Sequence, residues 1–125
     1  MDKNKILKLQ VIEEEINEID NKLKYIEEDL SSIKELKNDL KEIKKTKEDI
    51  AWVELKKGIY MPIKIVKGKL LIRLTNKEFI RKPIDETINL IDENLKKLLE
   101  TKSFFLEKFG DLESQINSLI KDKEE

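Results

Sequence analysis

A 3.5-residue apolar repeat runs through both halves of this chain and stops in the middle. In the second half it runs from Ile88 to Leu119, and Lys102 is its one position that is not apolar. In the first half it runs from Leu9 to Ile33. A 3.5 period keeps apolar side chains on one seam that faces a partner helix, so each half is predicted to be a long coiled-coil helix. The predicted seams consist of Leu9, Ile12, Ile16, Ile19, Leu23, Ile26, Leu30 and Ile33, and of Ile88, Ile91, Leu95, Leu98, Lys102, Phe105, Phe109, Leu112, Ile116 and Leu119.

After Ile33 the first seam is predicted to slip. Leu36, Leu40 and Ile43 continue it, but Leu36 follows Ile33 by three residues where four are expected. Two steps of three in succession form a stammer, which predicts local overwinding. Lys102 either specifies the register of the seam or buries its stem and keeps its ammonium in water.

Composition fits paired helices better than a compact globule. The apolar fraction is 38% and the charged fraction 42%, as expected where two residues in seven fill a seam. The chain has no cysteine and no histidine, which excludes thiol chemistry, zinc sites built on these residues and imidazole catalysis. Three glycines form no phosphate-binding loop, and the acidic clusters lack a partner base. We therefore predict neither an enzyme nor a cofactor.

No stretch of the sequence has the apolar length of a signal peptide or a membrane span. The sequence predicts a soluble, cytoplasmic protein that does not interact with membranes.

Between the helices, the apolar period changes from 3.5 to two. Four short runs, at 50–55, 59–66, 70–75 and 78–81, alternate in the manner of strands and predict two hairpins. Lys56-Lys57-Gly58, Lys67-Gly68 and Asn76-Lys77 are the turn signals between them. Pro62 lacks an N–H, which favours an edge or a bulge in the second run.

The predicted strands are too short to bury their apolar faces by themselves. Pairing with the same element of other subunits would cover these faces and close a β-barrel without free edges. The predicted fold is therefore α+β and mainly helical: an antiparallel two-helix coiled coil with a four-stranded insert that forms an oligomeric barrel hub. The expected hub residues are Trp52, Val53, Leu55, Ile59, Met61, Ile63, Ile65, Leu70, Ile72, Leu74 and Phe79.

Charge is divided unevenly along the chain. Residues 51–82 carry nine basic and two acidic side chains, whereas residues 1–50 and 83–125 are net acidic. Either the lysines protect strand edges in a solvated hub, or an acidic partner docks on it.

This order of elements resembles that of the prefoldin family over nearly the whole chain. The local similarity is greatest from Trp52 to Glu100, where the segments 53–58, 59–75 and 81–86 correspond to parts of the family's strand and turn pattern, and two hairpins are typical of the alpha-class subunit. The resemblance implies one domain over residues 1–125, with an N-terminal helix in 1–47, hairpins in 48–82 and a C-terminal helix in 83–125. A divergent paralogue that forms its own homo-oligomer is the alternative to a hetero-hexamer with beta-type subunits.

The same resemblance implies an ATP-independent holdase that binds unfolded polypeptides at the ends of its arms and passes them to a group II chaperonin. In this chain those ends are the termini, where Leu7, Val11 and Ile120 lie off the seams. Exposed apolar surface of this kind favours binding. The expected client-binding residues are Ile6, Leu7, Leu9, Val11, Ile12, Ile116, Leu119 and Ile120.

The alternative function is a nucleic-acid-binding or structural scaffold protein that uses the basic hub. The acidic helices would repel a phosphate backbone, and the aromatic residues of the insert form no evident stacking platform, so nucleic acid is disfavoured.

Overall fold

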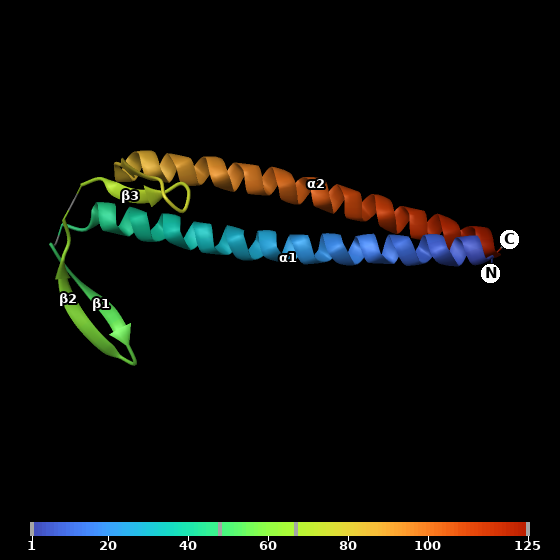
Figure 1. Cartoon of the computed structure of the whole chain (residues 1–125), viewed down its shortest axis with the longest axis horizontal. Coiled ribbons are helices and arrows are strands. Elements are labelled where there is room, and N and C mark those ends of the chain that lie inside the picture. Colours follow the sequence, from blue (N-terminus) through green and yellow to red (C-terminus); the bar gives the residue numbers. More distant parts are fainter. Residues whose placement is uncertain (1, 48, 67, 125) are drawn as a thin grey trace. The chain divides into compact units, whose positions relative to one another are not determined.

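The computed structural model describes residues 2–47, 49–66 and 68–124, with the side chains of 122–124 left out. Within these residues the order is helix α1 (Lys3–Lys45), strands β1 (Ile50–Lys56), β2 (Ile59–Lys64), β3 (Leu70–Arg73) and β4 (Phe79–Lys82), and helix α2 (Ile84–Glu124) (Figure 1). The predicted helix, two hairpins and helix are confirmed. Contacts divide the chain into a terminal unit, Met1–Ile33 with Asn94–Glu125, and a central unit, Lys34–Glu93.

Asp2 caps the N-terminus of α1. Its side chain accepts a hydrogen bond from the backbone N–H of Asn4 at 3.3 Å, and its carbonyl accepts one from the N–H of Ile6 at 3.1 Å. A helix leaves its first N–H groups without partners, and such a cap supplies one, typically stabilising the helix by about 1 kcal/mol.

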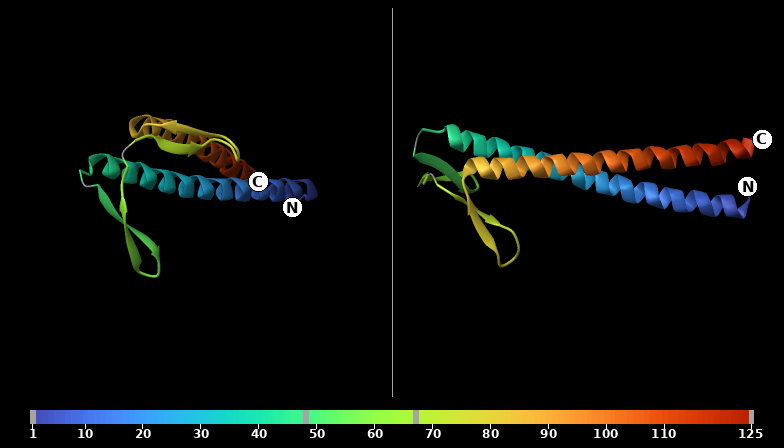
Figure 2. Two further views of the ribbon diagram at one scale, coloured as in Figure 1. Left: turned by 60° about the vertical axis from the view of Figure 1, so that its left-hand side comes forward. Right: turned by 90° about the horizontal axis from the view of Figure 1, so that it is seen from above.

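The terminal unit is a paired stretch of α1 and α2 around a narrow apolar core. Its centre consists of Ile12, Ile19 and Leu112, which are between 4% and 8% exposed, with Phe105 and Phe109 packed against them. The Nζ of Lys22 lies 5.3 Å from the centre of the Phe105 ring. Farther along α1, Glu27 pairs with Lys102, which is earlier in α2 than Phe105, so the helices run antiparallel here (Figures 1 and 2).

The predicted seams are confirmed over both helices except after Ile33. Every seam residue from Leu9 to Ile33, and from Ile88 to Leu119, is buried or half-buried. Lys102 buries much of its stem, because its side chain is only 33% exposed, and its ammonium pairs with Glu27 of α1. Its role in setting the register of the seam stays a prediction.

The predicted stammer is wrong. Leu36 is 48% exposed, whereas Lys37 is half-buried and Leu40 is only 6% exposed, so the seam continues in steps of four and three. Lys37 fills the position with its aliphatic stem and extends its ammonium to Asp92 of α2 at 2.5 Å. Because Lys37 occupies the seam position between Ile33 and Leu40, the 3.5-residue repeat of α1 continues without a shift at Leu36. Ile43, 36% exposed, is off the seam as well.

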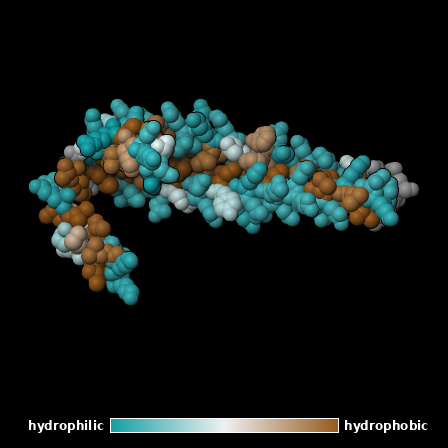
Figure 3. All heavy atoms as spheres, viewed as in Figure 1, coloured by the Kyte–Doolittle hydropathy of each residue, from teal (hydrophilic) through white to brown (hydrophobic). Residues whose placement is uncertain are grey.

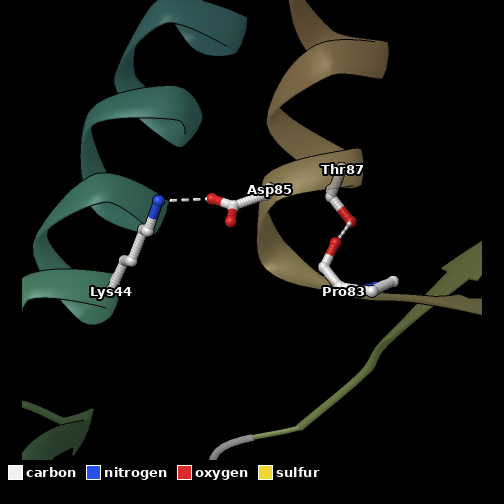
Figure 4. A network of polar contacts seen from close by, with 4 residues as sticks. All are labelled: Lys44, Pro83, Asp85 and Thr87. Atoms are coloured by element: carbon white, nitrogen blue, oxygen red, sulfur yellow. Dashed lines mark hydrogen bonds and ion pairs between the residues drawn. The ribbon is translucent and has the colours of Figure 1, made fainter.

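The start of α2 is fixed by Pro83 and the residues that follow it. The N–H and the hydroxyl of Thr87 both donate to the carbonyl of Pro83, at 3.0 and 2.9 Å, and Asp85 pairs with Lys44 of α1 (Figure 4). Lys44 follows Lys37 by seven residues while Asp85 precedes Asp92 by seven. Helix pairing in the central unit is therefore also antiparallel.

The four strands form two separate antiparallel hairpins, β1–β2 and β3–β4. The β1–β2 turn is the predicted Lys57-Gly58 pair, with φ of +51° and +78°, as type I′ turns require. Pro62 lies opposite Trp52 in β2. Among the described residues β2 pairs with β1 alone, so it is an edge strand, as its proline predicted. Gly68 closes no hairpin, because β2 and β3 are in different sheets, and Lys67 lies outside the described residues.

The two hairpins differ in how much of their surface is covered. All of β1–β2 except Ala51 is exposed. In β3–β4, one face is half-buried and the other is exposed. The half-buried face consists of Leu70, Ile72, Ile80 and Lys82. Leu70 and Ile72 are therefore covered in part by their own chain, and their part in the oligomeric hub stays a prediction.

Candidate functional site

An open groove of about 670 Å³ lies between α1 and α2 in the terminal unit. Leu7, Val11 and Ile12 of α1 and Leu119 of α2 supply its apolar surface. In Figure 3, apolar surface is visible between polar side chains near the end of the molecule that carries the termini. The remaining lining residues are Lys8, Glu15, Ser114, Gln115 and Ser118.

The residues predicted to bind clients divide into exposed and packed sets. Leu7 and Val11 are 58% and 53% exposed and line the groove, while Ile6 and Ile120 are exposed but are not among its lining residues. The packed set, in which Ile12 is 8% exposed and the others are half-buried, consists of Leu9, Ile12, Ile116 and Leu119. The groove therefore brings together four of the eight predicted residues, of which Leu7 and Val11 have the most area left to bury.

Sequence reasoning missed the neutral polar side of the groove, contributed by Ser114, Gln115 and Ser118. Ser114 and Ser118 are four residues apart and share a helix face, and Ser118 and Gln115 directly precede the seam residues Leu119 and Ile116. That adjacency could have identified them. Hydroxyl and amide groups both donate and accept hydrogen bonds, so this wall can satisfy peptide groups of either kind, and the facing wall offers apolar contact.

The expected hub residues are mostly exposed. On one face of β1–β2, Val53 lies opposite Met61. Ile59 and Ile63 are two residues before and after Met61 in β2, so they share this face. They are 36% to 63% exposed. We call Val53, Ile59, Met61 and Ile63 the aliphatic face. Apolar surface covers much of this hairpin in Figure 3.

The opposite face of β1–β2 is mixed in character. Trp52 and Tyr60 are 66% and 57% exposed there, and Glu54 and Lys64 share the face with them. The other expected hub residues are distributed more widely. Ile65 is half-buried after the end of β2, while Leu55, Leu74 and Phe79 are more than half exposed.

Within the described part of the chain, no group of three or more acidic, histidine or cysteine side chains could hold a metal ion. Over the same residues, neither helix has an apolar stretch that could cross a bilayer.

A family model described as Prefoldin subunit matches residues 12–123. The chain belongs to the prefoldin family. Prefoldins are chaperones and not enzymes, so the chain is a chaperone-type subunit. A search of curated proteins finds no match.

Among solved structures, the chain is similar to filamentous PFD from Methanocaldococcus jannaschii, determined by cryo-EM. The TM-score is 0.76 at 16% identity, and the match covers 90% of this chain and 95% of that one. At this identity the likeness shows the fold alone, namely the two long helices and four antiparallel strands of a prefoldin.

Proposed function

We propose that this prefoldin is a subunit of a cytoplasmic, ATP-independent holdase that binds non-native polypeptides and delivers them to a group II chaperonin. The observation that carries the proposal is the groove of about 670 Å³ between the helices, with Leu7 and Val11 exposed in it. Apolar surface of this kind on a helix that is otherwise charged favours an interaction site.

The composition of the groove favours clients without a common sequence. Aliphatic side chains contact any apolar residue, and Ser114, Gln115 and Ser118 can bond to the backbone that all polypeptides share. A single groove gives weak binding, and several subunits in one assembly raise the avidity. The proposed client-binding region is the predicted set of eight residues, with Leu7 and Val11 making the largest contribution.

Assembly would use the aliphatic face of β1–β2. Its partners would be beta-type prefoldin subunits or further copies of this chain. Four exposed apolar residues on one face of an isolated hairpin support this role, because such a hairpin is marginal alone and gains stability when its face is covered.

The test replaces Leu7→Ser and Val11→Ser together and measures suppression of aggregation of a denatured model protein without ATP. Full burial of a leucine or valine stabilises by about 1.5–3 kcal/mol, so burying the exposed half of each side chain contributes about 1 kcal/mol. The double variant should therefore bind clients about tenfold to thirtyfold more weakly.

The matched control is Leu99→Ser with Leu106→Ser. These leucines are 47% and 50% exposed in the same unit and lie outside the groove. Both double variants should keep the wild-type assembly mass. If the control loses as much holdase activity as the groove variant, clients bind exposed aliphatic surface in general, and the proposed site is wrong.

A further inference from the structure

The exposed face of the β3–β4 hairpin carries four residues in two cross-strand pairs. Leu71 lies opposite Arg81, and Arg73 lies opposite Phe79. All four are exposed, Leu71 at 64% and Phe79 at 53%, whereas the other face of the same hairpin is half-buried. We call these four residues the arginine face.

Arg73 and Arg81 are the only two arginines in the chain, in which every other basic side chain is a lysine. Both fall on this one face of one short hairpin. In the described part of the chain, neither arginine takes part in an ion pair. Among the described residues the arginines therefore serve no ion pair within their own chain, whereas Lys37, Lys44 and Lys102 each pair with an acidic residue of the facing helix.

Arginine differs from lysine in ways that matter for recognition. Its guanidinium is planar, always charged, and donates in a fork that fits a carboxylate with two parallel hydrogen bonds. Arginine and aromatic residues are also the side chains most enriched where interfaces bind tightly. An Arg–Phe pair beside an Arg–Leu pair thus offers a partner two guanidinium groups for carboxylates and two side chains for apolar contact.

The spacing of the arginines limits what they can bind together. Arg73 and Arg81 are diagonal neighbours across the hairpin, a relation that places side chains about 7–8 Å apart. In an extended peptide, residues two apart on one face are about 7 Å apart. Two carboxylates at i and i+2 would therefore meet the two guanidinium groups, and apolar residues at i−2 and i+4, which point to the same face of the peptide, would lie nearest to Leu71 and Phe79.

We propose that the arginine face is a docking site for an acidic, apolar-containing segment of a partner protein, separate from the client groove. Charge complementarity favours this occupant, because the insert at 51–82 has nine basic and two acidic side chains. Nucleic acid fits less well, since a single phenylalanine gives no platform for successive bases. The proposal uses Phe79 for docking, whereas the assembly role expected for it from the sequence stays a prediction. The docking role does not depend on holdase activity.

The probe is a fluorescent ten-residue peptide with Leu-Ser-Glu-Ser-Glu-Ser-Phe at its centre, which places Leu, both Glu and Phe on one face when it is extended. It is titrated into the full, assembled protein and followed by anisotropy. Two variant peptides replace the glutamates by glutamine or the Leu and Phe by serine, and both should bind at least several-fold more weakly. In the protein, Arg73→Lys with Arg81→Lys keeps the charge and removes the forks, and should weaken binding about tenfold. The control, Lys64→Gln with Lys69→Gln, removes two charges elsewhere in the insert and should change affinity less than threefold.

Five results would overturn the proposal. Wild-type protein that binds none of the peptides, or binds the glutamine peptide equally well, would exclude carboxylate recognition. If the control Lys64→Gln with Lys69→Gln loses as much peptide affinity as the Arg→Lys variant, or more, the peptide is attracted by net charge alone. A change in assembly mass in the Arg→Lys variant would make the face a contact between subunits. Tighter, arginine-dependent binding of an oligo(U) RNA would identify nucleic acid as the occupant.

Discussion

The substitution Met61→Lys tests whether the aliphatic face of β1–β2 holds the assembly together. The four residues of that face are 36% to 63% exposed in the isolated chain. Full burial of each is worth about 1.5–3 kcal/mol, so covering the exposed fractions contributes about 4 kcal/mol per subunit. Lysine at position 61 removes about 1 kcal/mol of this and places an unpaired ammonium in an apolar interface, which costs several kcal/mol more. We expect the association constant to fall by at least a hundredfold.

The assay is sedimentation velocity of the purified chain, alone and after co-expression with a beta-type prefoldin subunit. The matched control is Tyr60→Lys, which places the same charge one residue away on the opposite, mixed face of β2. Far-UV circular dichroism should report unchanged helix content in both variants, because neither residue belongs to α1 or α2. An unchanged mass for Met61→Lys, or equal dissociation of both variants, would refute assembly through the aliphatic face.

Three further predictions concern stability, each measured by thermal and urea unfolding of the full chain. Ile19→Ala should destabilise by about 2–4 kcal/mol, because Ile19 is 4% exposed in the terminal core, whereas Tyr25→Ala, at a position 68% exposed, should change stability by less than about 0.5 kcal/mol. Gly110→Ala should stabilise by about 1 kcal/mol, since the added methyl meets nothing within 4 Å inside a helix, while Gly58→Ala should destabilise by about 1 kcal/mol because its φ is +78°. Lys37→Leu should raise the urea midpoint, because a seam lysine reduces the stability of a coiled coil; a lower midpoint would show that the Lys37–Asp92 pair contributes more than apolar packing.

The helices could be predicted from sequence because apolar residues recur in it with the 3.5-residue period of a coiled coil. Leu9 to Ile33 and Ile88 to Leu119 repeat so regularly that only one packing face is available. The prediction failed at Leu36, where the sequence offered an aliphatic residue and the structure uses Lys37. Hydropathy assigns a lysine to the surface, but its four-carbon stem fills a seam position when an acidic residue of the partner helix lies within reach.

The proposed binding surfaces were harder to predict, because they depend on which residues the fold brings together. Exposure of Leu7 and Val11 followed from their positions off the seam. The sequence indicates Ser114 and Ser118 only through their position beside the seam, and they were recognised as part of the groove once α2 was placed against α1. The arginine face likewise needs the cross-strand register of β3 and β4, since Arg73 and Arg81 are eight residues apart in the sequence. Apolar residues at every second position predict that a segment is a strand, but they do not predict which face of the strand the rest of the protein covers.

The two walls of the groove are made at very different times during synthesis. Glu15 and Ser114 both line it, although roughly 100 residues separate them along the chain. At about 5–20 residues per second, the second wall follows the first by some 5–20 seconds. Until then the aliphatic side chains of α1 have no partner helix and are themselves the kind of surface that a chaperone binds. During synthesis the subunit therefore exposes apolar surface of the kind that the proposed groove offers to clients once α2 has packed against α1.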